Sequence, residues 1–169
     1  AFDQPIVPLS ELPMFSRTAE YALRAMACLA IRPSQLVPTT TLAEQTKVPA
    51  NYLAKVLQLL ASRDLIEGRR GVGGGYKLSR PADQINLLEV VNAVDPVERI
   101  TQCPLGLSNH GSYLCPLHRK ADQAAAAFIE IYQNVSLQDL LNDPRENKPL
   151  CDERTTAKLT IKGSLPDDL

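Results

Sequence analysis

The chain has 169 residues, and 44% of them are hydrophobic, which is enough to bury the core of one or two small domains. Its 18 Lys and Arg against 19 Asp and Glu, a net charge of −1, argue at first against a nucleic-acid binder, because such domains usually carry a basic excess. No window approaches ~20 uninterrupted apolar residues and no secretory signal opens the chain, so we expect a cytoplasmic protein without a membrane partner.

Residues 1–13 hold three prolines and no periodic pattern, and we interpret them as a disordered leader or extension. From Ser16 to Ile31 apolar residues recur at helical intervals, and Arg32-Pro33 ends the pattern. These features predict a first helix. Cys28 lies inside its apolar pattern, which indicates a buried thiol.

A helix-turn-helix is predicted next. Thr41 and Glu44 have the spacing of a capping box, which predicts a short second helix ending at Thr46. After a turn, Pro49 suits the first position of a third helix, because proline lacks the N–H that this position leaves unbonded. The third helix has an apolar face of Leu53, Val56, Leu57 and Leu60 and an opposite face of Ala50, Asn51, Ala54, Lys55 and Gln58.

A β-hairpin wing follows the third helix. Residues 65–67 and 76–78 are strand-like, and the glycine-rich segment 68–75 between them carries Arg69 and Arg70. A nucleotide-phosphate loop is a poor alternative, because no GKS/T sequence and no helix start directly follow the glycines.

Charge divides unevenly along the chain. Residues 14–80 carry ten basic and four acidic side chains, a net of +6, whereas residues 81–169 carry eight basic and thirteen acidic side chains, a net of −5. A basic segment that coincides with a helix-turn-helix and a wing is typical of DNA binding, because neutralising phosphates releases counterions.

Beyond the wing the pattern is helical again. Residues 87–95 form a predicted helix capped by Asn86, a long helix runs from Pro116 to Asn134, and Ser136 caps one more short helix. The long helix carries an alanine-rich apolar stripe made of Leu117, Ala121, Ala124, Ala125, Phe128, Ile129 and Tyr132. The fold class we expect is therefore mostly α with a small β-hairpin wing. Its parts are the leader 1–13, a winged helix-turn-helix DNA-binding domain at 14–81, a sensor loop and dimerisation helix at 82–142, and a flexible tail at 143–169.

Four stretches carry a family likeness: MFSRTAEYALRAM at 14–26, NYL at 51–53, RGVGGGY at 70–76 and EVVNAVD at 89–95. With these stretches, residues 14–142 resemble the winged-helix bacterial transcription regulators of the IscR/NsrR type. The resemblance implies a homodimer on an operator, interpreted here as a repressor, with the third helix in the major groove, the wing in the minor groove and the long helix crossing the dimer.

The residue chemistry agrees with that implication. Asn51 can pair bidentately with adenine, Lys55 and Gln58 can reach bases or phosphates, and the wing arginines suit a narrow minor groove. The DNA-binding residues we expect are Thr41, Asn51, Tyr52, Lys55, Gln58, Arg69, Arg70, Gly73 and Gly74.

The segment 103–118 corresponds to the sensor loop of the cluster-binding relatives, which carries three cysteines and sometimes a histidine. Cys103, Cys115 and His118 stand at matching positions, but Asn109 replaces the middle cysteine. His110 is adjacent to the gap, and the resemblance implies Glu20 as a carboxylate ligand from the partner's first helix. Mixed His/Cys ligation of an iron–sulfur cluster has a precedent. A cluster, a thiol switch and a loop without a sensor all remain open.

Other function classes fit less well. A winged-helix protein–protein interaction module without DNA binding is the alternative, and the basic segment with Arg69 and Arg70 argues against it. We expect no enzyme, because the sequence has two histidines, no H-x-x-x-H or C-x-x-C and no nucleophile elbow.

Overall fold

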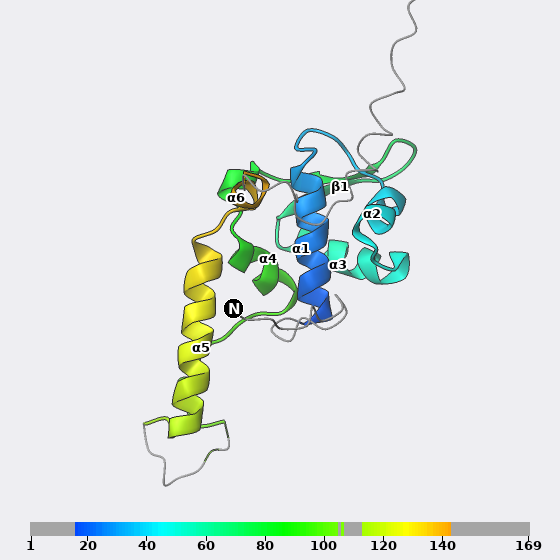
Figure 1. Ribbon diagram of the computed structural model, residues 1–169. Coiled ribbons are helices and arrows are strands. Elements are labelled where there is room, and N and C mark those ends of the chain that lie inside the picture. The colour runs from blue at the N-terminus through cyan, green and yellow to red at the C-terminus, as the bar shows by residue number, and fades with distance from the viewer. Residues whose placement is uncertain (1–15, 105, 107–112, 143–169) are drawn as a thin grey trace, which may run out of the picture.

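The computed structural model describes residues 16–104, 106 and 113–142 (Figure 1). The leader 1–13, Asn109, His110 and the tail 143–169 lie outside the described residues. The elements are α1 (Arg17–Ala30), α2 (Thr39–Thr46), α3 (Ala50–Ser62), β1 (Ile66–Arg69), β2 (Gly75–Leu78), the 3-10 helix η1 (Ala82–Gln84), α4 (Leu87–Val94), α5 (Pro116–Gln133) and α6 (Leu137–Leu141). This arrangement confirms the mostly helical fold class with a two-stranded wing.

Helix α1 lies in the middle of the fold and contacts α2, α3, α4, α6 and β2 (Figure 1). Ser16 caps its start, since its Oγ accepts a hydrogen bond from N of Ala19 at 3.1 Å. Nine of the 14 residues are buried, and Cys28 is fully buried, as predicted. The nine are Ala19, Glu20, Ala22, Ala25, Met26, Ala27, Cys28, Leu29 and Ala30. Because five of them are alanines, the surrounding helices can approach α1 closely.

The capping box predicted at Thr41 is wrong. Helix α2 begins two residues earlier, at Thr39, and its N-cap is Pro38, which makes no side-chain cap bond. The physical reason is a pairing distant in sequence. Val37 and Tyr76 exchange two backbone hydrogen bonds of 2.8 and 2.9 Å, so β2 determines where the extended chain ends and the helix begins.

Helix α3 starts one residue later than predicted. Pro49 is its N-cap, with an extended backbone at φ −55° and ψ 129°, and Ala50 is the first helical residue. The preceding turn contains Lys47 in the left-handed conformation, at φ 57°. The apolar face is buried as predicted: Leu53, Val56, Leu57 and Leu60 are each 0% exposed.

The wing is an antiparallel pair, in which Ile66 lies opposite Leu78 and Arg69 lies opposite Gly75. Gly75 also lies against residue 37. A Cβ atom at position 75 would lie 2.5 Å from the carbonyl carbon of Val37, so glycine is needed for the wing to pair this closely with that segment.

The predicted caps of the last part of the chain are confirmed. Asn86 and Glu89 form a reciprocal capping box at α4, and Ser136 and Asp139 form another at α6. Between these two helices the chain runs out along α5 and returns to the body. N of Leu87 donates a hydrogen bond of 2.9 Å to O of Val135, which holds the start of α4 next to the residues before α6.

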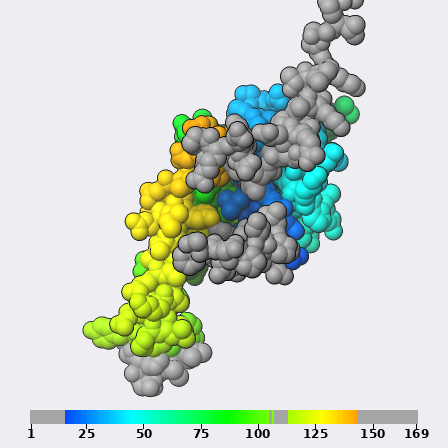
Figure 2. All heavy atoms as spheres, viewed as in Figure 1, coloured from blue at the N-terminus to red at the C-terminus, as the bar shows by residue number. Residues whose placement is uncertain are grey.

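Helix α5 is the least covered element among the described residues. None of its 18 residues is buried, and its N-terminal half projects away from the coloured body of the protein (Figures 1 and 2). Leu117 and Ile131 are 72% and 61% exposed. The long helix is thus confirmed. In its predicted apolar stripe, Leu117, Ala121 and Ala124 are exposed, whereas the residues from Ala125 to Tyr132 are half-buried against the body.

Candidate nucleic-acid interface and sensor loop

The face of α3 opposite the core is exposed and polar. Asn51, Lys55 and Gln58 are all exposed, one helical turn or less apart. Lys55 and Gln58 make no hydrogen bond or ion pair with other described residues, so both side chains are available to a ligand. Oδ1 of Asn51 accepts a hydrogen bond from N of Tyr52 at 2.9 Å. This face can therefore present an amide, an ammonium and a second amide to base edges and phosphates.

Tyr52 has contacts within the protein that its sequence position does not reveal. Its hydroxyl lies 2.7 Å from Oγ1 of Thr18, and its ring makes an edge contact with the ring of Tyr21, with centroids 5.4 Å apart and planes at 83°. The side chain is 37% exposed. It therefore ties the start of α3 to α1, beside any role that it has in binding DNA.

The wing and the start of α2 border an open hollow of about 560 Å³. Its lining includes Thr39, Thr40, Arg69, Arg70, Gly71 and Gly74. Both arginines are exposed, Gly73 lies at the exposed tip with φ +72°, and Thr41 is half-buried in the first turn of α2. The predicted interface residues outside α3 thus lie on the wing and in the first turn of α2.

Charge on the wing is mostly uncompensated. The only acid of the two strands, Glu67, forms an exposed ion pair of 3.2 Å with Lys77. Arg69 and Arg70 form no ion pair with any other described residue. Two unpaired guanidinium groups on an exposed hairpin favour the binding of a polyanion such as DNA.

The sensor loop brings together two of its predicted residues. Cys115 is the N-cap of α5, and its Sγ lies 3.3 Å from Nδ1 of His118 one turn further along the helix. Cys103 and Cys115 are half-buried and, within the described chain, neither forms a disulfide. No group of three His, Cys, Asp or Glu side chains that could hold a metal ion occurs in the described residues.

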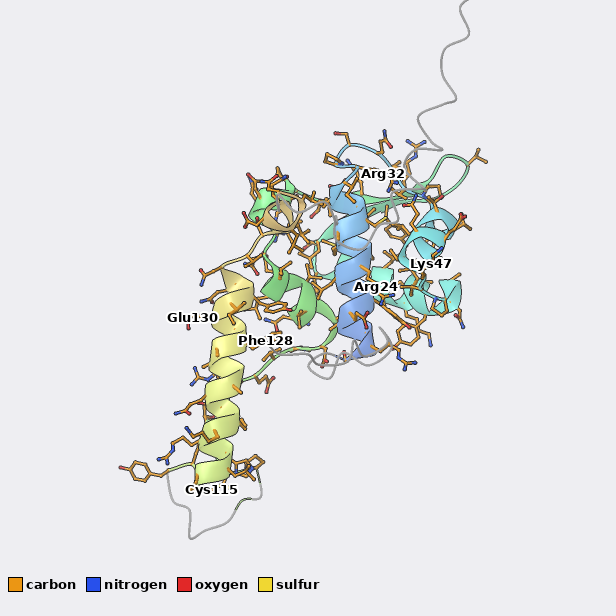
Figure 3. All side chains as sticks on the ribbon, viewed as in Figure 1. Arg24, Arg32, Lys47, Cys115, Phe128 and Glu130 are labelled. Carbon is orange, nitrogen blue, oxygen red and sulfur yellow. The ribbon has the colours of Figure 1, made fainter. Side chains whose placement is uncertain are left out.

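Glu20, the fourth predicted ligand, lies elsewhere. The residue is buried, and its carboxylate pairs with the guanidinium of Arg24, one turn along α1. In Figure 3, Cys115 is labelled at the tip of α5, far from Arg24 on α1. Within one chain, therefore, the structure does not bring Glu20 near the cysteines.

A contact that sequence reasoning missed connects the segment after α4 to α5. Arg99 donates two hydrogen bonds of 2.6 Å to the carboxylate of Asp122, which also accepts one of 2.9 Å from N of Ile100. The hydrogen bond from Arg99 is the main cause of a lowered pKa of Asp122. The two residues are 23 positions apart, and no spacing rule links them. We call this the Arg99–Asp122 clasp.

Comparison with known proteins agrees with this geometry. Residues 15–143 match the family model Rrf2, described as an iron-dependent transcriptional regulator. The chain belongs to the Rrf2 family. This confirms the predicted resemblance, and like its relatives this Rrf2 protein is a DNA-binding transcription regulator.

Individual relatives share most of the Rrf2 chain. The HTH-type transcriptional regulator NsrR of Bacillus licheniformis is 29% identical over 125 residues, which cover 72% of this chain and 87% of that protein. CymR, the global cysteine regulator of B. subtilis, has a TM-score of 0.62 at 22% identity, over 75% of this chain and 94% of its own. IscR of T. potens has a TM-score of 0.64 at 19% identity, over 83% of this chain and 94% of its own. The two structures show that the fold is shared.

In the described ranges, no helix has both the length and the apolar character that a membrane span requires.

The Arg99–Asp122 clasp gives a pH-dependent prediction. Because the pKa of Asp122 is lowered from its usual 3.8, its carboxylate contributes stability above that pH, and the contribution is lost as the pH falls through the lowered pKa. We expect Asp122→Asn to lower the urea midpoint of unfolding near neutral pH, and the difference from the parent to vanish in strong acid. Glu130→Gln, at an exposed position of the same helix, is the control. A difference that does not change with pH would contradict the assignment.

Proposed function

We propose that this Rrf2 regulator is a homodimeric repressor that binds double-stranded operator DNA with α3 in the major groove and the wing in the adjoining minor groove. The observation that carries the proposal is the exposed polar face of α3 together with the unpaired arginines of the wing, in a segment with ten basic and four acidic residues. The repressor role rests on the resemblance alone, and it predicts that deleting the gene raises transcription from a promoter that contains the operator.

The major groove admits an α-helix, and each base pair presents a distinct hydrogen-bonding pattern there. Asn51 lies in the first turn of α3, where its amide can pair with N6 and N7 of adenine. Arg69 and Arg70 are suited to a narrow minor groove, whose negative potential attracts arginine. Helix α3 therefore supplies base readout, and the wing supplies affinity for the DNA backbone.

A homodimer is supported by the apolar stripe of α5. The N-terminal part of the stripe, at Leu117, Ala121 and Ala124, is exposed among the described residues, and alanines at 121, 124 and 125 permit a second helix to approach closely. Next to it lies a hollow of about 390 Å³ between α1, α4 and α5, lined in part by Ala19, Val91, Ala124 and Phe128. A second copy packed about a two-fold axis would cover the same stripe on both chains and place two reading helices on one operator.

We further propose that the segment 103–118 senses the signal, through an iron–sulfur cluster or through its thiols. Cys115 and His118 fit two neighbouring ligands, since their donor atoms lie 3.3 Å apart. Cys103 is the remaining described thiol of the loop, and these donors are fewer than a two-iron cluster takes. A bound cluster would supply reversible electron transfer. A thiol switch instead requires only an exposed and reactive cysteine.

The readout is tested with Asn51→Ala and Arg70→Ala on an operator selected from random duplexes. Asn51→Ala should relax base preference by about 1 to 3 kcal/mol, and Arg70→Ala should weaken binding to all sequences and reduce its salt dependence. We call α2, α3 and the wing the reader; Lys120→Ala on α5 removes the same charge outside it and serves as the control. Parent-like affinity and selectivity in both reader variants would refute the assigned readout.

The dimer is tested by adding charge to the stripe. Ala124→Glu places a carboxylate on the apolar stripe, and burying it against a partner helix is strongly unfavourable. We expect a monomer in sedimentation equilibrium and weaker operator binding. Gln123→Glu adds the same charge at a neighbouring exposed position and should leave the dimer intact. A dimer in both variants would show that another surface associates.

The sensor is tested by purification without oxygen, followed by reconstitution with iron and sulfide. A cluster predicts visible absorbance and bound iron and sulfide, both reduced by Cys115→Ser. If neither appears, the cluster is excluded. A hydroperoxide-dependent change in operator affinity that Cys115→Ser or Cys103→Ser abolishes would then support the thiol switch.

A further inference from the structure

Arg24 connects α1 to the turn of the helix-turn-helix. Its Nη1 donates a hydrogen bond of 3.2 Å to the backbone oxygen of Thr46, and its Nη2 pairs with the carboxylate of Glu20. The guanidinium also lies 5.7 Å from the ring centre of Tyr21. Both charged side chains are nearly buried, at 12% exposure for Arg24 and 11% for Glu20. A nearly buried arginine that serves two acceptors has little freedom to move.

The backbone oxygen of Thr46, which accepts this bond, lies at the C-terminal end of α2. Thr46 is the last residue of α2, where backbone oxygens no longer find an amide within the helix. Lys47 follows in the left-handed conformation, and only residues 47–49 separate α2 from α3. Figure 3 labels Arg24 on α1 and Lys47 at the end of α2. Arg24 therefore binds the backbone at the point where the chain leaves α2.

The other side of the turn is held by the same helix. Tyr52, in the first turn of α3, bonds to Thr18 and packs its ring against Tyr21. Tyr21 therefore contacts both Arg24 and Tyr52. The first half of α1 thus holds the end of α2 and the start of α3 through one connected set of side chains.

We infer that Arg24, oriented by Glu20, is a positioning residue for DNA readout: it fixes the turn between α2 and α3 and thereby the angle at which Asn51 and Lys55 meet the groove. The inference rests on the proposed readout by α3. It also assigns Glu20 to the reader, in contrast to the ligand role that the resemblance implies. Withdrawing this carboxylate to a metal would leave the nearly buried Arg24 without its counter-charge, which is costly.

A purely stabilising ion pair would behave differently. It would change the melting temperature, but the folded fraction would still prefer the operator over random DNA by the same factor. A positioning residue changes that factor, because specific contacts depend on the angle of α3 whereas phosphate affinity depends mainly on charge. The ratio of operator affinity to random-duplex affinity is therefore the informative quantity.

The experiment compares Arg24→Gln, Arg24→Lys and Glu20→Gln with Arg99→Gln, which removes an ion-paired arginine outside the reader. Each variant is confirmed as folded by circular dichroism, and affinities for operator and random duplex are measured over a range of salt. For Arg24→Gln we expect operator affinity to fall about tenfold or more, as for a lost hydrogen bond to a charged group, with a loss of under about threefold on random duplex and an unchanged salt slope. Arg24→Lys should not restore the ratio, because one ammonium lacks the planar fork that reaches both acceptors. Arg99→Gln should leave the ratio unchanged.

An unchanged ratio in Arg24→Gln, or full restoration by lysine, overturns the inference. If Arg24→Gln does not fold, Glu20→Gln decides: a lowered operator ratio with unchanged iron uptake supports the inference, and an unchanged ratio overturns it. Asn51→Ala separates the two proposals. If Asn51→Ala relaxes base preference while Arg24→Gln has no effect, only the role of Arg24 fails. If Arg24→Gln lowers the ratio while Asn51→Ala has no effect, the proposed readout by Asn51 fails.

Discussion

Helix α1 is buried at the centre of the fold, and the surrounding helices are arranged by packing against it. Its alanines allow α2, α3, α4 and α6 to pack around one helix, and its apolar side chains, led by Met26 and Leu29, are removed from water on all sides. Helices α2 and α3 and strand β2 are therefore oriented against the same helix. Polar side chains add to this packing, since Cys28 of α1 and Arg32 just beyond its end both donate hydrogen bonds to Oε1 of Gln45 on α2, at 3.0 and 2.9 Å.

The near-neutral net charge is the sum of two different regions. A segment of net +6 holds the helix-turn-helix and the wing, and a segment of net −5 holds the sensor loop and α5. The physical demands on the two regions differ. The first must attract a polyanion, whereas the second carries the long helix α5, with the Cys115 thiol beside His118 at its start. Within the second region, the Arg99–Asp122 clasp ties the segment after α4 to α5.

Most elements followed from local rules. Helical periodicity identified α1, α3 and α5, and the caps at Asn86 and Ser136 were correct, because a cap involves residues only three positions apart. The two errors occurred at the starts of α2 and α3. At Thr41 the capping pattern was present but unused, because the pairing of Val37 with Tyr76 ends the extended chain earlier. A local capping pattern is not used where backbone hydrogen bonds to a residue distant in sequence already fix the start of the helix.

The sequence by itself determined the winged helix-turn-helix, the exposed face of α3, the arginines of the wing and the candidate residues of the sensor loop, since each depends on spacing or composition over a few residues. The contacts of Glu20 and Tyr52, in contrast, depend on how the helices pack. Arg24 and Thr46 are 22 positions apart, and Thr18 and Tyr52 are 34 apart. Such pairs come together because α1 is buried between helices, and no periodicity in the sequence specifies which side chains then meet.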